Sequence, residues 1–276
     1  MRRGRRGWRR ALTATALLAP VAAVAVLVDA CHVEPFRVEV TRHDLRAPVP
    51  RPIAIAHLTD LHTTGLGPRE REMIATIERE RPDAIVLTGD TNTDGSTFEG
   101  MRDVLSSLRA PLGVWAVRGN HEIWSFADRS RELYESSGIR YLENEAAELA
   151  PGVWLVGLDD AFAGRPDPSV AGRVPEGAYR IALFHAPVGF DAVAGRCDLA
   201  FAGHTHGGQI RIPLVHPFWL PPACGPYLAG WYERDGSRMY VSRGIGTTGP
   251  AIRFLCRPEV AVVRLVPSSR DVTGRK

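Results

Sequence analysis

The sequence predicts an α/β fold in which a β-sandwich is flanked by helices and preceded by an N-terminal membrane segment. Short apolar runs alternate with charged stretches of helical period, which is typical of buried strands between amphipathic helices. Asp, Asn and His follow several of these runs directly, where sites of α/β proteins gather. The 276 residues, 45% of them hydrophobic, are enough for one large domain or two small ones.

The first 30 residues have the composition of a signal or anchor segment. Residues 1–10 hold six Arg and no acid, and the next stretch, Ala11 to Val28, carries no charge. Its length is near the short end for a spanning helix, and the Arg cluster is expected to stay in the cytoplasm. We therefore expect a membrane anchor with the remaining chain on the extracytoplasmic side. Cleavage after Ala30 and twin-arginine export remain alternatives.

The rest of the chain is expected to form a linker at 31–52, one domain at 53–266 and a tail at 267–276. Three prolines, at 48, 50 and 52, break regular structure in the linker. Short apolar runs predict strands at Ile53–Thr59, Ala84–Thr88, Gly113–Val117, Val153–Leu158, Arg180–Phe184, Asp198–Ala202, Met239–Ser242 and Val260–Val266. Helical periodicity predicts helices at Arg69–Arg81, Phe98–Leu108 and Arg129–Ser137.

Charge and cysteine content exclude some functions. The net charge is +3, and without the six N-terminal Arg the remainder carries 3 − 6 = −3. A slightly acidic body lacks the basic stripe of a nucleic-acid-binding face, so no nucleic acid partner is expected. None of the four cysteines lies in a C-x-x-C pair, which argues against a thiolate zinc site. Buried thiols are expected, with a Cys224–Cys256 disulfide as an alternative outside the cytoplasm.

Five loops at the ends of expected strands carry side chains that are suited to metal binding. They read Asp60-Leu61-His62, Gly89-Asp90, Gly119-Asn120-His121-Glu122, Phe184-His185-Ala186 and Gly203-His204-Thr205-His206. Imidazole and carboxylate ligate Mn, Fe and Zn, and a D-x-H or H-x-H spacing turns both side chains to one side of an extended segment. Each motif alone has an ordinary structural explanation, such as a helix cap or a core histidine. Together, at strand ends, they predict one site. His57 lies inside the expected strand Ile53–Thr59, where side chains alternate between the two faces, and its side chain is expected in the core.

In this order the motifs resemble those of the calcineurin-like metallophosphoesterases, over residues 53 to about 265. The segments GHTHGGQIRIP and YVSRGIGTTGPAIRF resemble more narrowly a bacterial membrane-associated branch. That branch includes phosphodiesterases and enzymes that cleave UDP-2,3-diacylglucosamine. One departure concerns the family's G-D-x-x-D motif, since Thr93 stands at the second Asp and the carboxylate comes one place later, at Asp94.

The resemblance implies a metallophosphoesterase-type β-sandwich and a phosphoester hydrolase with two divalent metal ions, Mn, Fe or Zn. The implied ligands of one ion are Asp60, His62 and His206, those of the other are Asn120, His185 and His204, and Asp90 bridges both. A bridging hydroxide would attack phosphorus. His121 would protonate the leaving oxygen, and Glu122 would lie outside the ligands and orient a histidine.

Two features of the sequence bear on the identity of the substrate, namely the membrane segment and one unusual loop. Leu214 to Tyr232 is rich in aromatics and proline, which fits either a packed irregular flap or a lip that meets lipid. Arg211, Arg243 and Arg253 are candidates to bind a distal phosphate. We expect a membrane- or envelope-associated phosphodiester, such as a UDP-2,3-diacylglucosamine-like glycolipid precursor. A phosphatase or nuclease of the same fold and a non-catalytic metal-binding scaffold are the alternatives.

Overall fold

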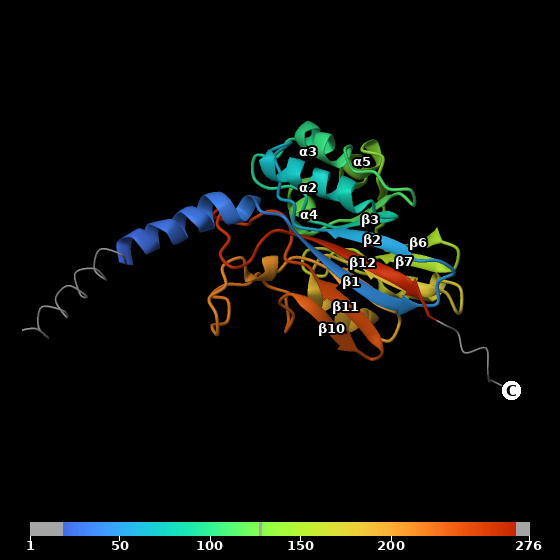
Figure 1. Ribbon diagram of the computed structural model, residues 1–276. Coiled ribbons are helices and arrows are strands. Elements are labelled where there is room, and N and C mark those ends of the chain that lie inside the picture. The colour runs from blue at the N-terminus through green and yellow to red at the C-terminus, as the bar shows by residue number, and fades with distance from the viewer. Residues whose placement is uncertain (1–18, 127–128, 269–276) are drawn as a thin grey trace, which may run out of the picture.

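A computed structural model describes residues 19–126 and 129–268 and shows two mixed β-sheets packed face to face (Figure 1). The first sheet has the order β1 (Glu39–Ala47), β12 (Glu259–Pro267), β2 (Ile53–Leu58), β3 (Ala84–Thr88), β4 (Val114–Val117) and β5 (Arg140–Tyr141). The second has the order β10 (Gly230–Arg234), β11 (Ser237–Val241), β9 (Leu199–Ala202), β8 (Tyr179–Leu183), β7 (Val153–Gly157) and β6 (Glu145–Ala150). The predicted α/β sandwich is confirmed.

Helices cover the outer faces of the two sheets. Over the first sheet lie α2 (Pro68–Glu80), α3 (Phe98–Leu105) and α5 (Ser130–Ser136), as Figure 1 shows. Shorter elements pack on the second sheet, namely η4 (Pro168–Arg173), η5 (Pro187–Gly189) and α6 (Phe190–Val193). Helix α2 begins where the Glu70 carboxylate accepts a hydrogen bond from the Gly67 amide at 3.1 Å, and α3 begins where Thr97 accepts from Gly100.

The core lies in three apolar layers that the strands separate. Between the sheets, Ile55 and Val86 of the first sheet pack in one cluster with Leu155, Ile181 and Phe201 of the second. Neighbouring positions of the same strands turn outward and pack beneath the helices. Because both faces of each central strand are covered, these strands are apolar throughout, which explains why the sequence located them well.

The central strands of each sheet run parallel, so their carboxyl ends share an edge. Strands β2, β3 and β4 are parallel in the first sheet, and β7, β8, β9 and β11 are parallel in the second. The loops that follow these strands carry the predicted ligands. Helix α4 (Asn120–Phe126) starts at one of these ligands, just after β4.

The expected linker at 31–52 is wrong in its central part. Residues 39–47 form β1, which pairs in parallel with β12 along its whole length of nine residues. This strand lies at the sheet edge and carries outward charged side chains, as edge strands do, so its apolar signal is weak. The three prolines follow the strand instead of interrupting it. Strands β6 and β10 and helix α4 were also not expected.

The N-terminal helix covers residues 19–28 and continues as η1 (Asp29–Val33) and η2 (Glu34–Phe36). By length and composition Ala19–Phe36 could cross a membrane. This helix shares residues 19–28 with the expected segment, whereas residues 1–18, with the Arg cluster, lie outside the described residues. So does the tail from residue 269. All four cysteines are free thiols, so the alternative Cys224–Cys256 disulfide is not found.

His57 is a buried core residue, as expected from its place in β2. Its Nε2 atom lies 2.8 Å from the Thr88 hydroxyl, and its ring lies 4.9 Å from that of Phe201. Burial lowers the pKa of His57 to about 3, since the imidazolium would lose its hydration.

Replacement of His57 by Gln should flatten the pH dependence of stability. The folded protein binds this proton more weakly than the unfolded chain does, so the contribution is present above about pH 6.5 and is lost as the pH falls towards 3. Urea unfolding should show a steeper loss for the wild type than for His57→Gln, by up to about 1.4 kcal/mol per pH unit. Equal slopes for the two proteins would contradict the buried neutral imidazole.

Candidate metal centre

The predicted ligands come together at the shared edge of the two sheets. Three groups have ligand atoms within 4.8 Å of one another: Asp60, His62 and His206; His62, Asp90 and His121; and Asp90, His185 and His204. Asn120 lines the same pocket. All seven predicted ligands are buried, whereas His121 is half-buried.

The backbone at these ligands is strained in a shared way. Five of them have left-handed φ angles between 40° and 70°: Asp60, His62, Asp90, His204 and His206. That conformation costs roughly 1–2 kcal/mol for a residue with a Cβ, although Asp and His tolerate it better than most. Such strain gathers at functional sites, where the surrounding fold enforces it.

Two glycines allow the loops to approach closely enough to bring the ligands together. A Cβ at Gly119 would overlap the Asp90 carboxylate, and a Cβ at Gly203 would overlap Thr59 and the Asp60 carboxylate. The absence of a side chain therefore lets the loops after β4 and β9 pass directly against the two acids.

Hydrogen bonds to backbone carbonyls fix the tautomers of three histidines. His185 Nδ1 lies 2.7 Å from Thr88 O, His62 Nδ1 lies 3.0 Å from Asn92 O, and His204 Nε2 lies 2.6 Å from Pro222 O. A carbonyl oxygen only accepts, so each of these ring nitrogens donates. The other nitrogen of each neutral ring then turns a lone pair towards the site, as it does in metal-ligating histidines.

These ring nitrogens lie at short range from other ring nitrogens and from carboxylate oxygens. His185 Nε2 lies 3.0 Å from His204 Nδ1 and 3.1 Å from Asp90 Oδ2. On the other side, His206 Nε2 lies 3.2 Å from His62 Nε2 and 3.3 Å from Asp60 Oδ1. Wherever neither atom of such a pair carries a proton, the two lone pairs repel one another unless a cation lies between them.

The Asn120 side chain supports the same interpretation. Its buried Oδ1 atom has no hydrogen-bond partner within residues 19–126 and 129–268. A buried amide oxygen without a donor is costly, and a cation would satisfy it. Imidazole, carboxylate and amide oxygen without thiolate form a donor set that fits divalent ions such as Mn, Fe or Zn.

Burial sets the protonation of the histidine ligands. It lowers the pKa of His62 to about 3 and that of His204 to about 4, and places the pKa of His206 well below its ordinary value. These three imidazoles are therefore neutral at pH 7 and able to ligate. His185 differs, because burial opposes its charge but the Asp90 carboxylate holds its pKa well above the ordinary value.

The pKa values of the two buried acids, Asp60 and Asp90, are shifted in opposite directions. Burial, assisted by repulsion from Asp90, raises the pKa of Asp60 to about 6, although His185 opposes the shift. Burial would also raise the pKa of Asp90, but the charge and hydrogen bond of His185 hold it well below the ordinary range. Without a bound ion, the proton of the Asp90–His185 pair thus lies on His185, where its charge compensates that of the Asp90 carboxylate.

Glu122 has a different role from the expected one. Its Oε2 atom accepts hydrogen bonds from the amides of Asp90 at 2.9 Å and Gly119 at 2.8 Å, and its Oε1 atom accepts from the Thr91 amide at 2.6 Å and the Tyr134 hydroxyl at 3.0 Å. The expectation that it orients a histidine is wrong. Instead it ties together the loops after β3 and β4, which carry Asp90 and Asn120.

His121 lies at the open side of the ligand groups. Its Nε2 atom is 4.0 Å from Asp90 Oδ2, its ring meets that of His62 edge to face at 4.6 Å, and its amide donates to Asp90 Oδ1 at 2.9 Å. Its side chain is 23% exposed, so it is accessible from the pocket while the ligands are covered.

The pocket above the ligands holds about 220 Å³, and its rim is apolar. Trp124, Phe162, Trp219, Pro221 and Pro222 form this rim. Sequence reasoning missed Trp124 and Phe162, although Trp124 follows His121 by about one helical turn and so shares its face. Buried Asp160 holds the backbone of Phe162 in place. The Asp160 carboxylate accepts hydrogen bonds from the amide of Phe162 and from the amide of Ala186, which follows His185.

The departure at Asp94 leaves the ligand groups intact. Asp94 is exposed and outside these groups, while Asn92 holds the loop by donating to His121 O at 3.2 Å. Two of the three candidate arginines are committed elsewhere. Arg253 is fully buried and donates to backbone carbonyls, and Arg243 pairs with Glu39 and Glu259.

Replacement of Glu122 by Gln should weaken metal binding while the fold is retained. One carboxylate oxygen would become an amide donor that faces backbone N–H groups, so the two loops would separate. We expect the affinity for Mn²⁺ to fall about 10- to 100-fold in calorimetric titration of the full chain. The exposed Glu135→Gln change is the matched control. An unchanged affinity in Glu122→Gln would show that the loops hold without it.

Comparison with known proteins agrees with this geometry. Residues 53–208, more than half of the chain, match the calcineurin-like phosphoesterase family. The chain is 31% identical over 250 residues to the uncharacterized metallophosphoesterase YkuE of Bacillus subtilis, covering 85% of this chain and 87% of that protein. It is 30% identical over 268 residues to an uncharacterized metallophosphoesterase of Aquifex aeolicus, covering 88% and 97%.

A third relative has a named substrate. The chain is 27% identical over 215 residues to the UDP-2,3-diacylglucosamine pyrophosphatase LpxG of Chlamydia trachomatis, covering 57% of this chain and 65% of that protein. The family match and the two longer alignments determine the assignment: the chain belongs to the calcineurin-like metallophosphoesterase family and is a phosphoester hydrolase.

Proposed function

We propose that the chain is a phosphodiesterase with two divalent metal ions, Mn, Fe or Zn, that acts on a membrane- or envelope-associated substrate. The observation that carries the two-ion site is the convergence of imidazole nitrogens on the oxygens of two buried acids in two adjacent groups. Asp90 belongs to both sides, since its Oδ2 atom lies 3.1 Å from His185 Nε2 and 3.7 Å from His62 Nε2. Asp90 is therefore the proposed bridging ligand.

The remaining ligands divide between the two ions by position. Asp60, His62 and His206 would hold one ion, and Asn120, His185 and His204 would hold the other. When bound, such a pair of ions supplies an activated water and neutralises the charge that develops on the phosphoryl oxygens. Asn120 would contribute a neutral oxygen, so the two carboxylates of Asp60 and Asp90 would balance half of the charge of two divalent ions.

His121 is the proposed proton donor to the leaving oxygen. It is the partly exposed imidazole at the open side of the ligands, and its amide is anchored on Asp90. That position allows its ring to reach a leaving group in the pocket without occupying a ligand place. The aromatic rim would exclude water from the far side of the bound ester.

Membrane association rests on the N-terminal helix. Ala19–Phe36 is proposed as an anchor that leaves the domain on the extracytoplasmic side of the cell membrane, with an exported form as the alternative. The similarity to LpxG supports a lipid-linked phosphodiester of the UDP-2,3-diacylglucosamine type as the substrate. The apolar rim of the pocket is compatible with that class.

Hydrolysis of bis(p-nitrophenyl) phosphate and p-nitrophenyl phosphate tests the activity. The wild-type chain should turn over the diester faster, and only with added Mn²⁺, Fe²⁺ or Zn²⁺. His121→Ala should keep its metal but lose about 10²- to 10⁴-fold in kcat. Asp90→Asn should lose both metal and turnover, while the exposed Asp94→Asn change should lose neither.

Two results would overturn this assignment. Turnover that persists after complete metal removal would exclude the two-ion reaction. A metal-loaded wild type that hydrolyses neither these esters nor UDP-2,3-diacylglucosamine would favour the non-catalytic scaffold.

A further inference from the structure

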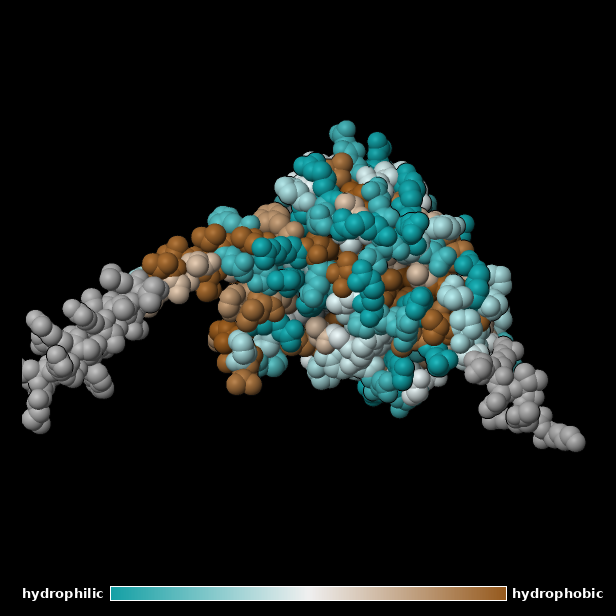
Figure 2. Space-filling view, viewed as in Figure 1, coloured by the Kyte–Doolittle hydropathy of each residue, from teal (hydrophilic) through white to brown (hydrophobic). Residues whose placement is uncertain are grey.

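The outer side of the loop between β9 and β10 is unusually apolar and exposed. We name residues 210–222 the apolar loop. Leu214 is fully exposed, and Phe218 and Trp219 are 78% and 60% exposed. No Asp or Glu occurs between Asp198 and Glu233, so no carboxylate of this segment opposes contact with anionic lipid. Figure 2 shows hydrophobic residues gathered at the end of the molecule from which the N-terminal helix leaves.

The apolar loop is physically joined to the base of that helix. Gln209 O and the Arg211 amide bond to the backbone of Phe254, at 3.1 and 2.8 Å. The next amide, of Leu255, donates to the buried Glu34 carboxylate at 2.9 Å, and the Arg253 amide donates to Ala30 O at 3.0 Å. The strip 253–256 thus holds the loop on one side and the helix end on the other.

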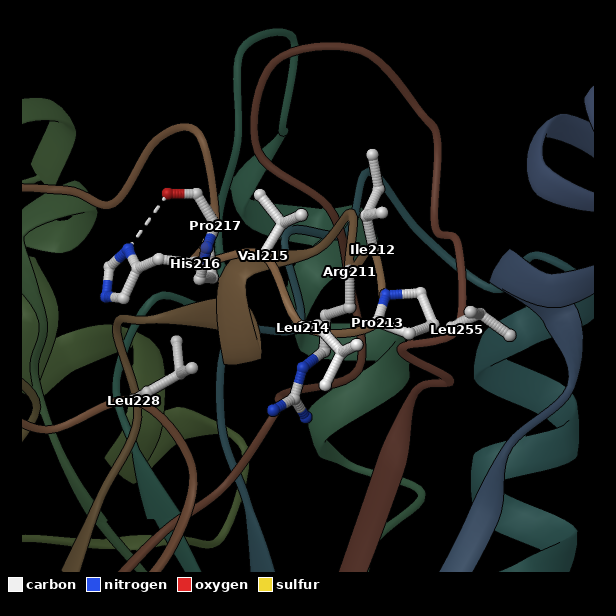
Figure 3. Close-up of a pocket in the computed structure, with 9 residues that line it drawn as sticks. All are labelled: Arg211, Ile212, Pro213, Leu214, Val215, His216, Pro217, Leu228 and Leu255. Atoms are coloured by element: carbon white, nitrogen blue, oxygen red, sulfur yellow. Dashed lines mark hydrogen bonds between the residues drawn. The ribbon is translucent and has the colours of Figure 1, made fainter.

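Side chains complete this junction. An open pocket of about 520 Å³ lies between the loop and the strip, and Leu255 lines it together with Ile212, Pro213 and Leu214 (Figure 3). Arg211 adds a cationic side chain to this pocket. The helix is therefore fixed to the domain beside the loop, and residues 19–28 continue outward with exposed apolar side chains.

The other end of the apolar loop reaches the metal centre. Trp219, Pro221 and Pro222 line the metal pocket, and Pro222 O accepts the hydrogen bond that sets the His204 tautomer. A single segment thus extends from the exposed apolar tip to a proposed ligand.

We propose that the apolar loop is a membrane-contacting lip that enters the headgroup region of the bilayer in which the N-terminal helix is embedded. The partner is the lipid surface because the lip is continuous with the helix base and lacks acidic groups. It also carries Trp and Phe, which favour the membrane interface, beside Arg211, which can meet lipid phosphate. A packed flap would bury these side chains, whereas Leu214 and Phe218 are among the most exposed hydrophobics.

The lip has a consequence for substrate access that rests on the proposed function. With the tip in the headgroup region, the rim at Trp219 and Pro222 turns the metal pocket towards the membrane surface. A phosphodiester at the head of a lipid would then reach the ligands without leaving the bilayer, whereas a soluble diester would not depend on the lip.

Site-specific fluorescence in vesicles tests the contact itself. The full chain with Cys31→Ser, whose other thiols are buried, would be reconstituted in phosphatidylethanolamine–phosphatidylglycerol vesicles and labelled with bimane at Leu214→Cys or Phe218→Cys. Nitroxide-bearing lipids should quench both positions at least about twofold more than Glu176→Cys, an exposed site before the amino end of β8. Val24→Cys in the helix serves as the positive control.

Two outcomes would overturn the lip. Quenching at Val24 without quenching at Leu214 and Phe218 would show that the helix inserts while the loop stays in water. A blue-shifted but unquenched label at Leu214 would show that another protein covers the loop instead of lipid.

Turnover separates the lip from the proposed function. Leu214→Glu with Phe218→Glu should leave bis(p-nitrophenyl) phosphate hydrolysis unchanged and should lower turnover of vesicle-embedded UDP-2,3-diacylglucosamine about tenfold. Equal turnover of the embedded substrate by variant and wild type would overturn the role in access. A wild-type chain that turned over neither substrate would contradict the proposed function alone. The quenching experiment would still test whether the lip contacts the membrane.

Discussion

The site depends on one constraint, the close approach of several ring nitrogens to the oxygens of two buried carboxylates. Backbone carbonyls take the N–H of neutral His62 and His204, so the lone pairs of their other ring nitrogens turn into the site, where a cation can bind them. His185 donates to a backbone carbonyl in the same way, and its other ring nitrogen faces Asp90. The strained backbone of five ligands and the glycine contacts beside both acids maintain this arrangement. Each strained residue costs roughly 1–2 kcal/mol, a large share of a typical net stability of 5–15 kcal/mol.

The constraint also links the site to the fold. Asp60, His62, Asp90 and Asn120 follow strands of the first sheet, whereas His185, His204 and His206 follow strands of the second. The candidate ligands meet only when the sheets pack face to face, so an ion bound there would stabilise the sandwich as a whole. Glu122 acts within one sheet, where it holds two adjacent loops, and Pro222 connects the second sheet's ligand His204 to the apolar loop.

The buried strands and the candidate ligands stand out in the sequence for the same physical reason. Strands such as Ala84–Thr88 are apolar throughout because both faces are covered, and the polar residues that follow them are conspicuous. The sequence alone does not reveal β1 because an edge strand alternates exposed charges with half-buried residues. In the sequence analysis Glu122 is paired with a histidine, whereas its carboxylate accepts from the amides of Asp90, Thr91 and Gly119. These contacts depend on how the loops after β3 and β4 stack, which motif spacing does not reveal.

Long-range packing accounts for the other differences. Phe162 reaches the pocket rim from a loop after β7, and the Arg253 guanidinium donates to backbone carbonyls of the loop after β11 and to Cys256 O. Neither outcome follows from residue type. A short apolar and aromatic run was ambiguous between a packed flap and an exposed lip, and only the exposure of Leu214 and Phe218 distinguishes the two.

Electron paramagnetic resonance of the Mn²⁺-loaded full chain tests the central claim most directly. If Asp90 bridges two ions about 3.5–4 Å apart, the spectrum should show an exchange-coupled Mn²⁺ pair at saturation. The coupling should disappear in Asp90→Asn. An uncoupled single-ion spectrum from the saturated wild type would contradict the two-ion centre.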